Sequence, residues 1–216
     1  MLALQFTPVL GLLLGGWGLD DWRGFFVHPA RAALLGVTAC GGLMILILKL
    51  DLHPLRRGNS PLGYQSLVLG ILSLASLFLI WFLPFADRRG ILQLSANEDL
   101  RYLGLLLVAG AIAIRLMALQ RLGRYFSAYV TLQHEHRLVQ SGIYGVIRHP
   151  LYLSLLLAAP GFALVFSSAL VAPILALTVL FVSMRIWQEE RLLELRFREG
   201  FSDYRRRTRA LIPLVL

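Results

Sequence analysis

Four apolar runs, each long enough to cross a lipid bilayer, recur along the chain and are separated by polar or charged segments. A helix needs about 20 residues to cross roughly 30 Å of hydrocarbon, so the pattern predicts membrane-spanning helices. Residues 1–19 are also apolar, but no positively charged segment precedes them. They predict a short first span or a membrane-surface helix rather than a cleaved signal peptide. The four runs are Ala30–Leu50, Leu62–Phe85, Leu100–Leu119 and Leu151–Met184.

The last apolar run is too long for a single span. Leu151–Met184 holds no charged residue, and as one helix it would be about 51 Å long, well beyond the hydrocarbon core. Pro160-Gly161, Ser167-Ser168 and Pro173 are candidate breaks. We expect a helical hairpin that turns near Ser167-Ser168 and returns both of its ends to the same side of the membrane.

A polar segment, Arg121–Pro150, interrupts the apolar pattern. It contains three of the five histidines, several arginines and the turn-forming pair Ser141-Gly142, so it cannot span a membrane. Long polar segments inside a compact chain usually carry function. We therefore expect an all-α, polytopic membrane protein with about five to six transmembrane segments. Residues 1–119 would form N-terminal transmembrane helices, and residues 120–216 a second, functional region.

The composition agrees with a membrane location. Of the 216 residues, 57% are hydrophobic and 15% are charged, whereas a soluble domain has roughly 45–50% and about 25%. This excludes a soluble enzyme, a disordered chain and a disulfide-stapled secreted module. Cys40, the single cysteine, lies in an apolar run, so neither an intramolecular disulfide nor a cysteine-based zinc site can form.

The net charge of +9 comes almost entirely from arginine, since Lys49 is the only lysine. In a soluble protein such an excess suggests nucleic acid, but in a membrane protein it marks cytoplasmic loops and suits anionic lipid headgroups. With both hairpin ends on one side, fifteen basic residues share the face of the C-terminal tail and five lie opposite. We therefore expect the polar segment and the tail to face the cytoplasm, with membrane lipids and no nucleic acid as partners. The five opposite residues are Arg23, Arg31, Arg88, Arg89 and Arg101.

His149 and Pro150 predict where the first arm of the hairpin begins. A residue before proline avoids helical geometry, and proline suits the first helical position. The N–H groups and positive dipole end of that helix would lie beside Arg148 and His149, a favourable seat for a carboxylate or a phosphate. The residues alone support equally well an interfacial helix start with snorkelling arginine and tyrosine side chains.

Arg185 and Glu189 directly follow the last apolar run and share one helix face, because they are four residues apart. The interpretation favoured by spacing alone is an ion pair worth about 0.2–0.5 kcal/mol. In the alternative, both side chains point into a cavity at membrane depth, where charges are costly and usually kept for function. There Arg185 would hold a substrate carboxylate or phosphate, and Glu189 would accept hydrogen bonds from a cofactor amine.

Other polar residues are weaker indicators of a functional site. His134 and His136 lack a clear third ligand, so we expect no metal site. The glycines of residues 15–18 lack the register and the preceding strand of a dinucleotide-binding loop. Arg115 either lines the same cavity or snorkels to the interface. Residues 205–207, three consecutive arginines, are most simply a lipid-facing or solvated basic cluster.

Several motifs in the C-terminal half resemble a known family in their order and spacing. They are His136-x-Leu138-Val139-x-Ser141-Gly142-x-Tyr144, Arg148-His149-Pro150-x-Tyr152, Glu189-Glu190 and a closing Phe197…Tyr204…Ile212-Pro213. Together they are similar to the isoprenylcysteine carboxyl methyltransferase family, within the wider group of membrane methyltransferases that includes phospholipid N-methyltransferases. The resemblance covers roughly Arg121 to Pro213.

The resemblance implies an integral membrane enzyme that uses S-adenosylmethionine without a Rossmann domain. Residues 120–216 would then be its catalytic region, with a cofactor pocket that faces the cytoplasm. Arg185 and Glu189 would be catalytic: Arg185 would bind the methyl acceptor, a lipophilic or lipidated substrate, and Glu189 would also contact the cofactor. Arg148, Gln133 and Glu190 are further candidates. The implied cofactor-binding residues are His136, Arg137, Leu138, Val139, Tyr144, His149, Pro150, Leu151, Tyr152 and Glu189.

The chain departs from the family pattern at four positions. Ile143 stands where proline is common, and Arg198 where glycine usually follows the phenylalanine. Phe201 stands where tyrosine is usual, and Arg209 where proline is frequent. Most of these departures lie in the tail, so they bear on how the tail closes over the cofactor, whereas the implied cofactor ligands are intact.

The chemistry of the implied site favours a carboxylate as the methyl acceptor, because a carboxylate is already nucleophilic and needs no general base. An amine or a thiol would need deprotonation, and no base for that step is evident. The expected function is methyl transfer from S-adenosylmethionine to a carboxylate of an isoprenylcysteine-like or other lipid-like molecule. The alternatives are a phospholipid or small amine or thiol methyltransferase, a membrane sterol-type reductase with a similar H-P-x-Y helix start, and a non-enzymatic lipid-binding protein.

Overall fold

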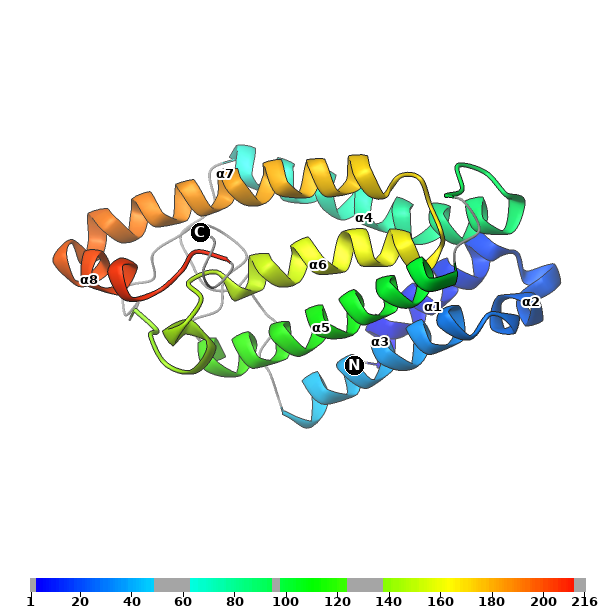
Figure 1. Ribbon diagram of the computed structural model, residues 1–216, viewed down its shortest axis with the longest axis horizontal. Coiled ribbons are helices and arrows are strands. Elements are labelled where there is room, and N and C mark those ends of the chain that lie inside the picture. Colours follow the sequence, from blue (N-terminus) through cyan, green and yellow to red (C-terminus); the bar gives the residue numbers. More distant parts are fainter. Residues whose placement is uncertain (1–2, 49–62, 95–97, 124–137, 212–216) are drawn as a thin grey trace.

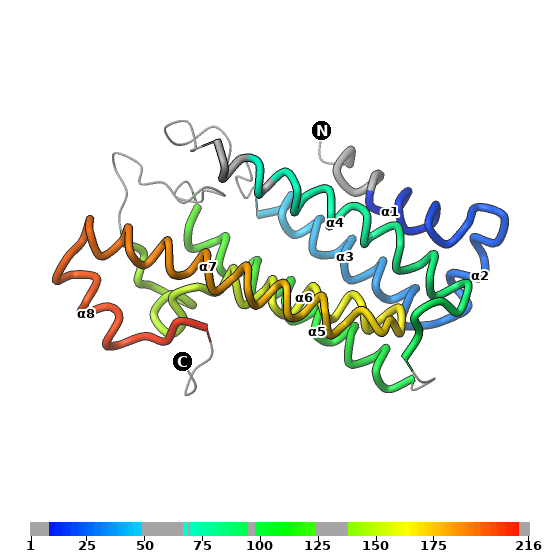
Figure 2. Tube along the Cα trace, turned by 90° about the horizontal axis from the view of Figure 1, so that it is seen from above, coloured from blue at the N-terminus to red at the C-terminus, as the bar shows by residue number. Residues whose placement is uncertain are grey.

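In the computed structural model the chain forms a bundle of long helices that run along one axis (Figures 1 and 2). The structure describes residues 3–48, 63–94, 98–123 and 138–211. The expected all-α class is confirmed. The helices are α1 (Ala3–Trp17), α2 (Trp22–Val27), α3 (Pro29–Ile47), α4 (Gly63–Arg89), α5 (Glu98–Leu122), α6 (Pro150–Val165), α7 (Val171–Phe197) and α8 (Glu199–Arg207), with 3₁₀ segments η1 (Leu19–Asp21) and η4 (Gly142–Gly145).

Among the residues that the structure describes, four helices are long and apolar enough to cross a membrane, namely α3, α4, α5 and α7. α3, α4 and α5 coincide with three of the expected apolar runs, apart from a few residues at their ends, whereas the fourth run, Leu151–Met184, holds α6 and the first part of α7. α1 has 15 residues and α6 has 16, fewer than the roughly 20 that a perpendicular span needs. The expected total of about five to six spans therefore stays a prediction.

α6 and α7 form the expected hairpin. The chain turns between Val165 and Val171, and Ser167 reverses it with a left-handed φ of 49°. The other candidate breaks do not interrupt a helix, since Pro160 lies inside α6 and Pro173 in the first turn of α7, where proline is tolerated. The charged stretch that follows Met184 continues the second arm of the hairpin without a break.

The first hairpin arm, α6, anchors the hairpin on the rest of the bundle by packing against α5. Gly104 of α5 and Gly161 of α6 face each other so closely that a Cβ on Gly104 would lie 2.5 Å from the Gly161 carbonyl oxygen. Without side chains at these positions the two helix backbones can approach directly. α5 also packs against α3, α7 packs against α6, and α1 packs against α4.

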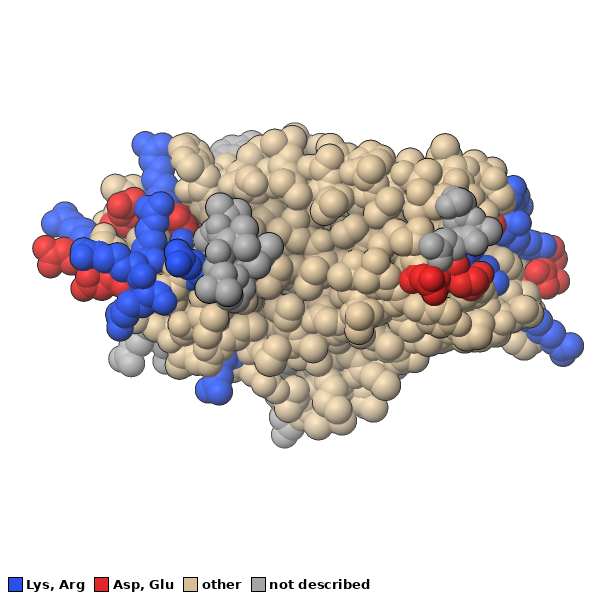
Figure 3. Space-filling view, viewed as in Figure 1, with Lys and Arg blue, Asp and Glu red and all other residues tan. Residues whose placement is uncertain are grey.

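Charged side chains gather at the two ends of the bundle, and the band between them is nearly free of charge on the face that Figure 3 shows. One end, here the α2 end, holds η1, α2 and the α6–α7 turn. The opposite end, here the α8 end, holds η4, the start of α6 and α8. An uncharged belt between two polar ends is the distribution expected of a bundle embedded in a bilayer.

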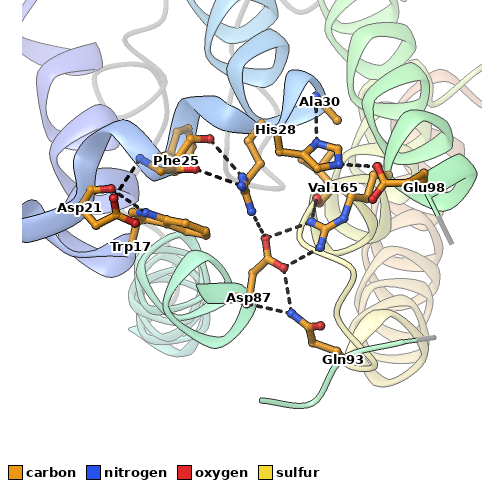
Figure 4. Close-up of polar contacts among 12 residues, drawn as sticks. Trp17, Asp21, Phe25, His28, Ala30, Asp87, Gln93, Glu98 and Val165 are labelled. Atoms are coloured by element: carbon orange, nitrogen blue, oxygen red, sulfur yellow. Dashed lines mark hydrogen bonds and ion pairs between the residues drawn. The ribbon is translucent and has the colours of Figure 1, made fainter. Parts of the chain in front are cut away.

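A buried carboxylate shared by two arginines ties the α2 end together (Figure 4). Asp87 of α4 accepts hydrogen bonds from Arg31 of α3 at 2.9 Å and from Arg101 of α5 at 2.7 and 2.9 Å. The exposed fraction of the Asp87 side chain is 1%. Arg31 also donates to the Phe25 carbonyl of α2, and Arg101 to the Val165 carbonyl at the end of α6. One acidic residue therefore connects α2, α3, α4, α5 and α6.

The arginines of the α2 end are balanced by acidic residues. Asp87 serves two of them, and Asp20 pairs with Arg88. This end contains five arginines and five acidic residues. The acidic residues are Asp20, Asp21, Asp87, Glu98 and Asp99. In the described part of the α8 end, arginine is in excess by ten to five. The ten are Arg121, Arg148, Arg185, Arg191, Arg196, Arg198, Arg205, Arg206, Arg207 and Arg209, and the five acidic residues are Glu189, Glu190, Glu194, Glu199 and Asp203.

We expect Asp87→Asn to destabilise the protein by about 3–5 kcal/mol, because two buried guanidinium groups lose their shared counter-charge. Asp20→Asn is the matched control, since it removes the exposed partner of Arg88 and should leave the melting temperature nearly unchanged. Thermal unfolding of both variants in detergent micelles measures the difference. A wild-type melting temperature for Asp87→Asn would contradict the structural role of this carboxylate.

Candidate functional site

The α8 end brings together residues that the motifs place far apart in the sequence. Residues 138–149 lead into α6, and residues 185–190 lie on the later turns of α7. α7 runs back along α6 after the hairpin turn, so its charged end returns to the point where α6 begins. The candidate site therefore lies between the start of α6, the end of α7 and the tail.

The expected helix start at Pro150 is confirmed. Pro150 is the first residue of α6, and the His149 carbonyl accepts the N–H groups of Tyr152 and Leu153, each at 3.1 Å. The His149 side chain makes no capping hydrogen bond to the helix. It is 4% exposed, so its ring is committed to contacts inside the protein.

His149 lies between two carboxylates of α7. Its Nε2 is 3.1 Å from Glu190 Oε1, and its Nδ1 is 3.9 Å from Glu189 Oε2. The same Glu190 oxygen accepts a hydrogen bond from Arg148 Nε at 2.9 Å. Glu190 thus holds residues 148 and 149, whereas the Glu189 side chain is 38% exposed and more open to a ligand.

Tyr152 lies near Arg185 and Glu189. The charges of both side chains act on its hydroxyl, and its ring centroid is 5.7 Å from that of His149. Arg185 is buried. It therefore lies inside the cluster of motif residues, not on the exposed helix face that a simple surface ion pair would occupy. This burial argues against a simple surface ion pair, and the interpretation in which Arg185 and Glu189 face a cavity stays a prediction.

Two buried tyrosines join η4 to α8. The Tyr204 hydroxyl donates a hydrogen bond to the Tyr144 carbonyl at 2.7 Å. Burial raises the pKa of Tyr144, and the nearby charge of Glu189 raises it further. Burial also raises the pKa of Tyr204 to about 12. Both phenols are therefore neutral at physiological pH, and Tyr204 keeps its proton as a donor.

The tail packs back onto the segment that precedes α6. The Arg209 N–H donates to the Val146 carbonyl at 3.0 Å, while the Arg148 and His149 N–H groups donate to the carbonyls of Arg209 and Ala210 at 2.7 and 3.0 Å. Arg209 is one of the departures from the family pattern. A proline has no N–H to donate, so arginine at this position adds a hydrogen bond that holds the tail closed.

Arg198, another departure from the family pattern, lies at the corner between α7 and α8 and strains the backbone there. Arg198 adopts a φ of 44° with a ψ of −118°. Glycine reaches this conformation easily, whereas a residue with a Cβ is strained in it. The glycine of the family pattern thus has a physical reason, and Arg198 introduces strain. Phe201, where tyrosine is usual, is 1% exposed and fills a buried position of α8.

The remaining motif residues differ in what the structure says of them. Gln133, His136 and Arg137 lie outside the described residues. Leu138 and Val139 are half-buried in the segment before η4, Leu151 is half-buried in the first turn of α6, and Ile143 lies in η4.

Two expectations outside the motifs can also be compared with the structure. Arg115 is exposed on α5, which favours snorkelling over a place in the cavity. In the part of the chain that the structure describes, no group of three or more His, Cys, Asp or Glu side chains is arranged to hold a metal ion.

Sequence reasoning missed the part that the tail backbone takes in the site. The carbonyls of Arg205 and Thr208 both accept hydrogen bonds from Arg148. Tyr204, which anchors α8 on η4, had a signal in the closing motif. The two carbonyls had none, because a backbone acceptor has no residue type by which a sequence could mark it.

Comparison with known proteins confirms the family resemblance. Residues 103–195 match the model of the isoprenylcysteine carboxyl methyltransferase (ICMT) family. The cobalt-zinc-cadmium resistance protein CzcN of Cupriavidus metallidurans is 36% identical over 110 residues, 50% of this chain and 50% of that protein. A probable protein-S-isoprenylcysteine O-methyltransferase of Oryza sativa is 29% identical over 117 residues, 53% of this chain and 61% of that protein. The chain spans about half the length of the first of these relatives and three fifths of the second.

The fold also matches a solved structure. The eukaryotic intramembrane Ras methyltransferase ICMT is similar with a TM-score of 0.55 at 20% sequence identity, over 86% of this chain and 67% of that chain. The two proteins share their fold. Together with the four long apolar helices, this likeness makes the chain an integral membrane protein.

We expect Arg198→Gly to raise the melting temperature. Relief of the strained backbone should gain about 1–3 kcal/mol, and the added freedom of the unfolded chain should offset about 0.5–1 kcal/mol of it. Arg196→Gly is the control, because it makes the same change inside α7 and should destabilise by about 1 kcal/mol. Thermal unfolding of both variants checks the prediction, and a lower melting temperature for Arg198→Gly would contradict the strain.

Proposed function

Since residues 103–195 match the isoprenylcysteine carboxyl methyltransferase family, we propose that this protein is an integral membrane methyltransferase. It transfers a methyl group from S-adenosylmethionine to a carboxylate of an isoprenylcysteine-like or other lipid-like molecule. The observation that carries the proposal is the meeting of His149, Tyr152, Arg185 and Glu189 at one place, the α8 end. These residues come from motifs more than thirty positions apart, yet they line the same site.

The residues present fit the proposed cofactor. When bound, S-adenosylmethionine supplies an electrophilic methyl group on a positively charged sulfur. His149 and the N–H groups at the start of α6 suit the carboxylate of its methionine part, and Glu189 suits a positive or N–H-bearing part. Tyr144 and Tyr152 offer aromatic faces to a cation. On the family pattern, the same binding role extends to His136, Arg137, Leu138, Val139, Pro150 and Leu151.

Arg185 is the proposed handle for the methyl acceptor. It is buried at the end of the apolar part of α7, where a lipophilic molecule in the bilayer meets the polar site. A guanidinium group binds a carboxylate strongly and in a defined orientation. The carboxylate is already the nucleophile, so the protein's task is to align it with the methyl group and to keep water out.

The α8 end is proposed to face the cytoplasm. The arginines at the α2 end are matched one for one by acidic residues, while the described α8 end has twice as many arginines as acidic residues. Net positive charge near a membrane is retained on the cytoplasmic side. In this orientation the cofactor enters from the cytoplasm and the lipophilic acceptor from the bilayer.

The direct test is transfer of radiolabelled methyl from S-adenosylmethionine to an S-farnesyl cysteine derivative with a free carboxylate, using the protein in lipid nanodiscs. The expected product is a methyl ester, which releases labelled methanol in base. The same compound supplied as its methyl ester is the control and should accept no label. Label that survives base would indicate N- or S-methylation, NADPH-dependent reduction of an alkene would indicate a reductase, and neither activity would favour a lipid-binding protein.

Substitutions of Glu189 and Arg185 should have different effects, one on the affinity for the cofactor product and the other on the KM of the methyl acceptor. Glu189→Gln should weaken S-adenosylhomocysteine binding about tenfold, because a charge-assisted hydrogen bond is lost. Arg185→Lys should raise the KM of the acceptor and change that affinity little, because lysine cannot hold a carboxylate in the two-point manner of arginine. Calorimetry and initial rates provide the two readouts, with Glu194→Gln, an exposed residue of α7, as the control. An unchanged affinity in Glu189→Gln would refute its assigned role.

A further inference from the structure

Arg148 contacts three separate parts of the α8 end. Its Nε donates to Glu190 of α7 at 2.9 Å, and its Nη1 donates to the Arg205 carbonyl of α8 at 3.2 Å and to the Thr208 carbonyl of the tail. The Arg148 side chain is 8% exposed. These contacts direct the guanidinium toward the protein itself, whereas an arginine that grips a ligand would point into the site.

The tail residues 208–210, here called the strap, lie along residues 146–149 in a parallel pairing. Three backbone hydrogen bonds join the two segments, at 2.7 to 3.0 Å. The Thr208 hydroxyl donates to the Tyr204 carbonyl at 2.7 Å, which fixes the strap to the end of α8. The strap therefore covers the segment that carries His149, and Arg148 is the side chain that joins the strap to α7.

Glu190 extends this connection to His149. A single oxygen, Oε1, lies 2.9 Å from Arg148 Nε and 3.1 Å from His149 Nε2. With Nε2 donating to this oxygen, the orientation of the imidazole is set by a carboxylate that Arg148 holds in place. A displacement of Arg148 would release Glu190 and the strap together, and the histidine would lose its support on both sides.

We propose that Arg148 is a positioning residue of the methyltransferase site. By joining Glu190 to the strap, it holds His149 and the start of α6 in the arrangement that binds the cofactor. This inference rests on the proposed function, but the link between Arg148 and the strap is measurable without any ligand. Arg148 itself touches neither the cofactor nor the acceptor in this role.

The experiment measures two quantities on the full chain in lipid nanodiscs. Hydrogen exchange at the Arg148 and His149 amides reports the strap, because both amides donate to strap carbonyls. Calorimetry with S-adenosylhomocysteine reports the cofactor site. Arg148→Gln should speed exchange at both amides and weaken binding, each by about tenfold or more. Arg206→Gln is the control, since Arg206 is 78% exposed and should leave both quantities unchanged.

The variant Arg148→Lys distinguishes the bridging contacts of the Arg148 guanidinium from the effect of its positive charge alone. Lysine keeps the positive charge, but one ammonium group cannot reach Glu190 and two carbonyls with the geometry of a guanidinium. We expect an intermediate loss in both measurements. Full wild-type behaviour of Arg148→Lys would overturn the bridging role.

A second pair of variants loosens the strap without touching the Arg148 side chain. Arg209→Pro removes the N–H that donates to Val146, whereas Arg209→Ala keeps it. We expect faster exchange and weaker binding in Arg209→Pro and wild-type behaviour in Arg209→Ala. This comparison stays informative if Arg148→Gln does not fold.

Two results for Arg148→Gln would overturn the inference, and a third would overturn the proposed function instead. Weaker binding in Arg148→Gln with unchanged amide exchange would mean that Arg148 contacts the ligand directly, which overturns the inference. Faster exchange with unchanged affinity would mean that the strap does not position the site, which overturns it as well. If the wild type binds no S-adenosylhomocysteine while Arg148→Gln still speeds exchange, the proposed function fails although the Arg148–strap link exists.

Discussion

The arrangement of the helices depends on one buried carboxylate. Asp87 neutralises two arginines that would otherwise be buried without a counter-charge, and these arginines reach backbone carbonyls of two further helices. The same carboxylate accepts from Gln93, whose neighbours Leu92 and Leu94 exchange backbone hydrogen bonds with the hairpin turn. Breaking a buried pair is strongly unfavourable, so the position of the turn is tightly held.

The position of the hairpin turn decides which residues of α6 and α7 lie side by side in the candidate site at the α8 end. Both hairpin arms rise about 1.5 Å per residue, so positions equally far from the turn lie beside each other. α6 has 16 residues between its start at Pro150 and the turn, and the same distance along α7 leads from Val171 to the neighbourhood of Arg185. The hairpin thus brings Arg185, Glu189 and Glu190 to the start of α6, although the turn that aligns them lies at the opposite end of the bundle.

The tail shows how departures from a family pattern act through the backbone. Arg198 places a side chain where the backbone has a left-handed φ, which strains the corner between α7 and α8. Arg209 supplies an N–H that proline lacks, and that N–H binds the segment before α6. One departure strains the corner before α8, and the other adds a hydrogen bond that holds the tail on the segment before α6.

The amino-acid sequence by itself determined the apolar spans, the hairpin turn near Ser167-Ser168 and the helix start at Pro150. These features follow from local rules, since hydrophobic length, chain reversal and proline geometry each act within a few residues. The partners of Arg31, Arg101 and Arg148 were decided only by the tertiary structure. A count of charges treats these arginines alike, but their roles depend on the acceptors that the fold brings to them. Most of those acceptor atoms are backbone carbonyl oxygens, which no residue type marks in the sequence.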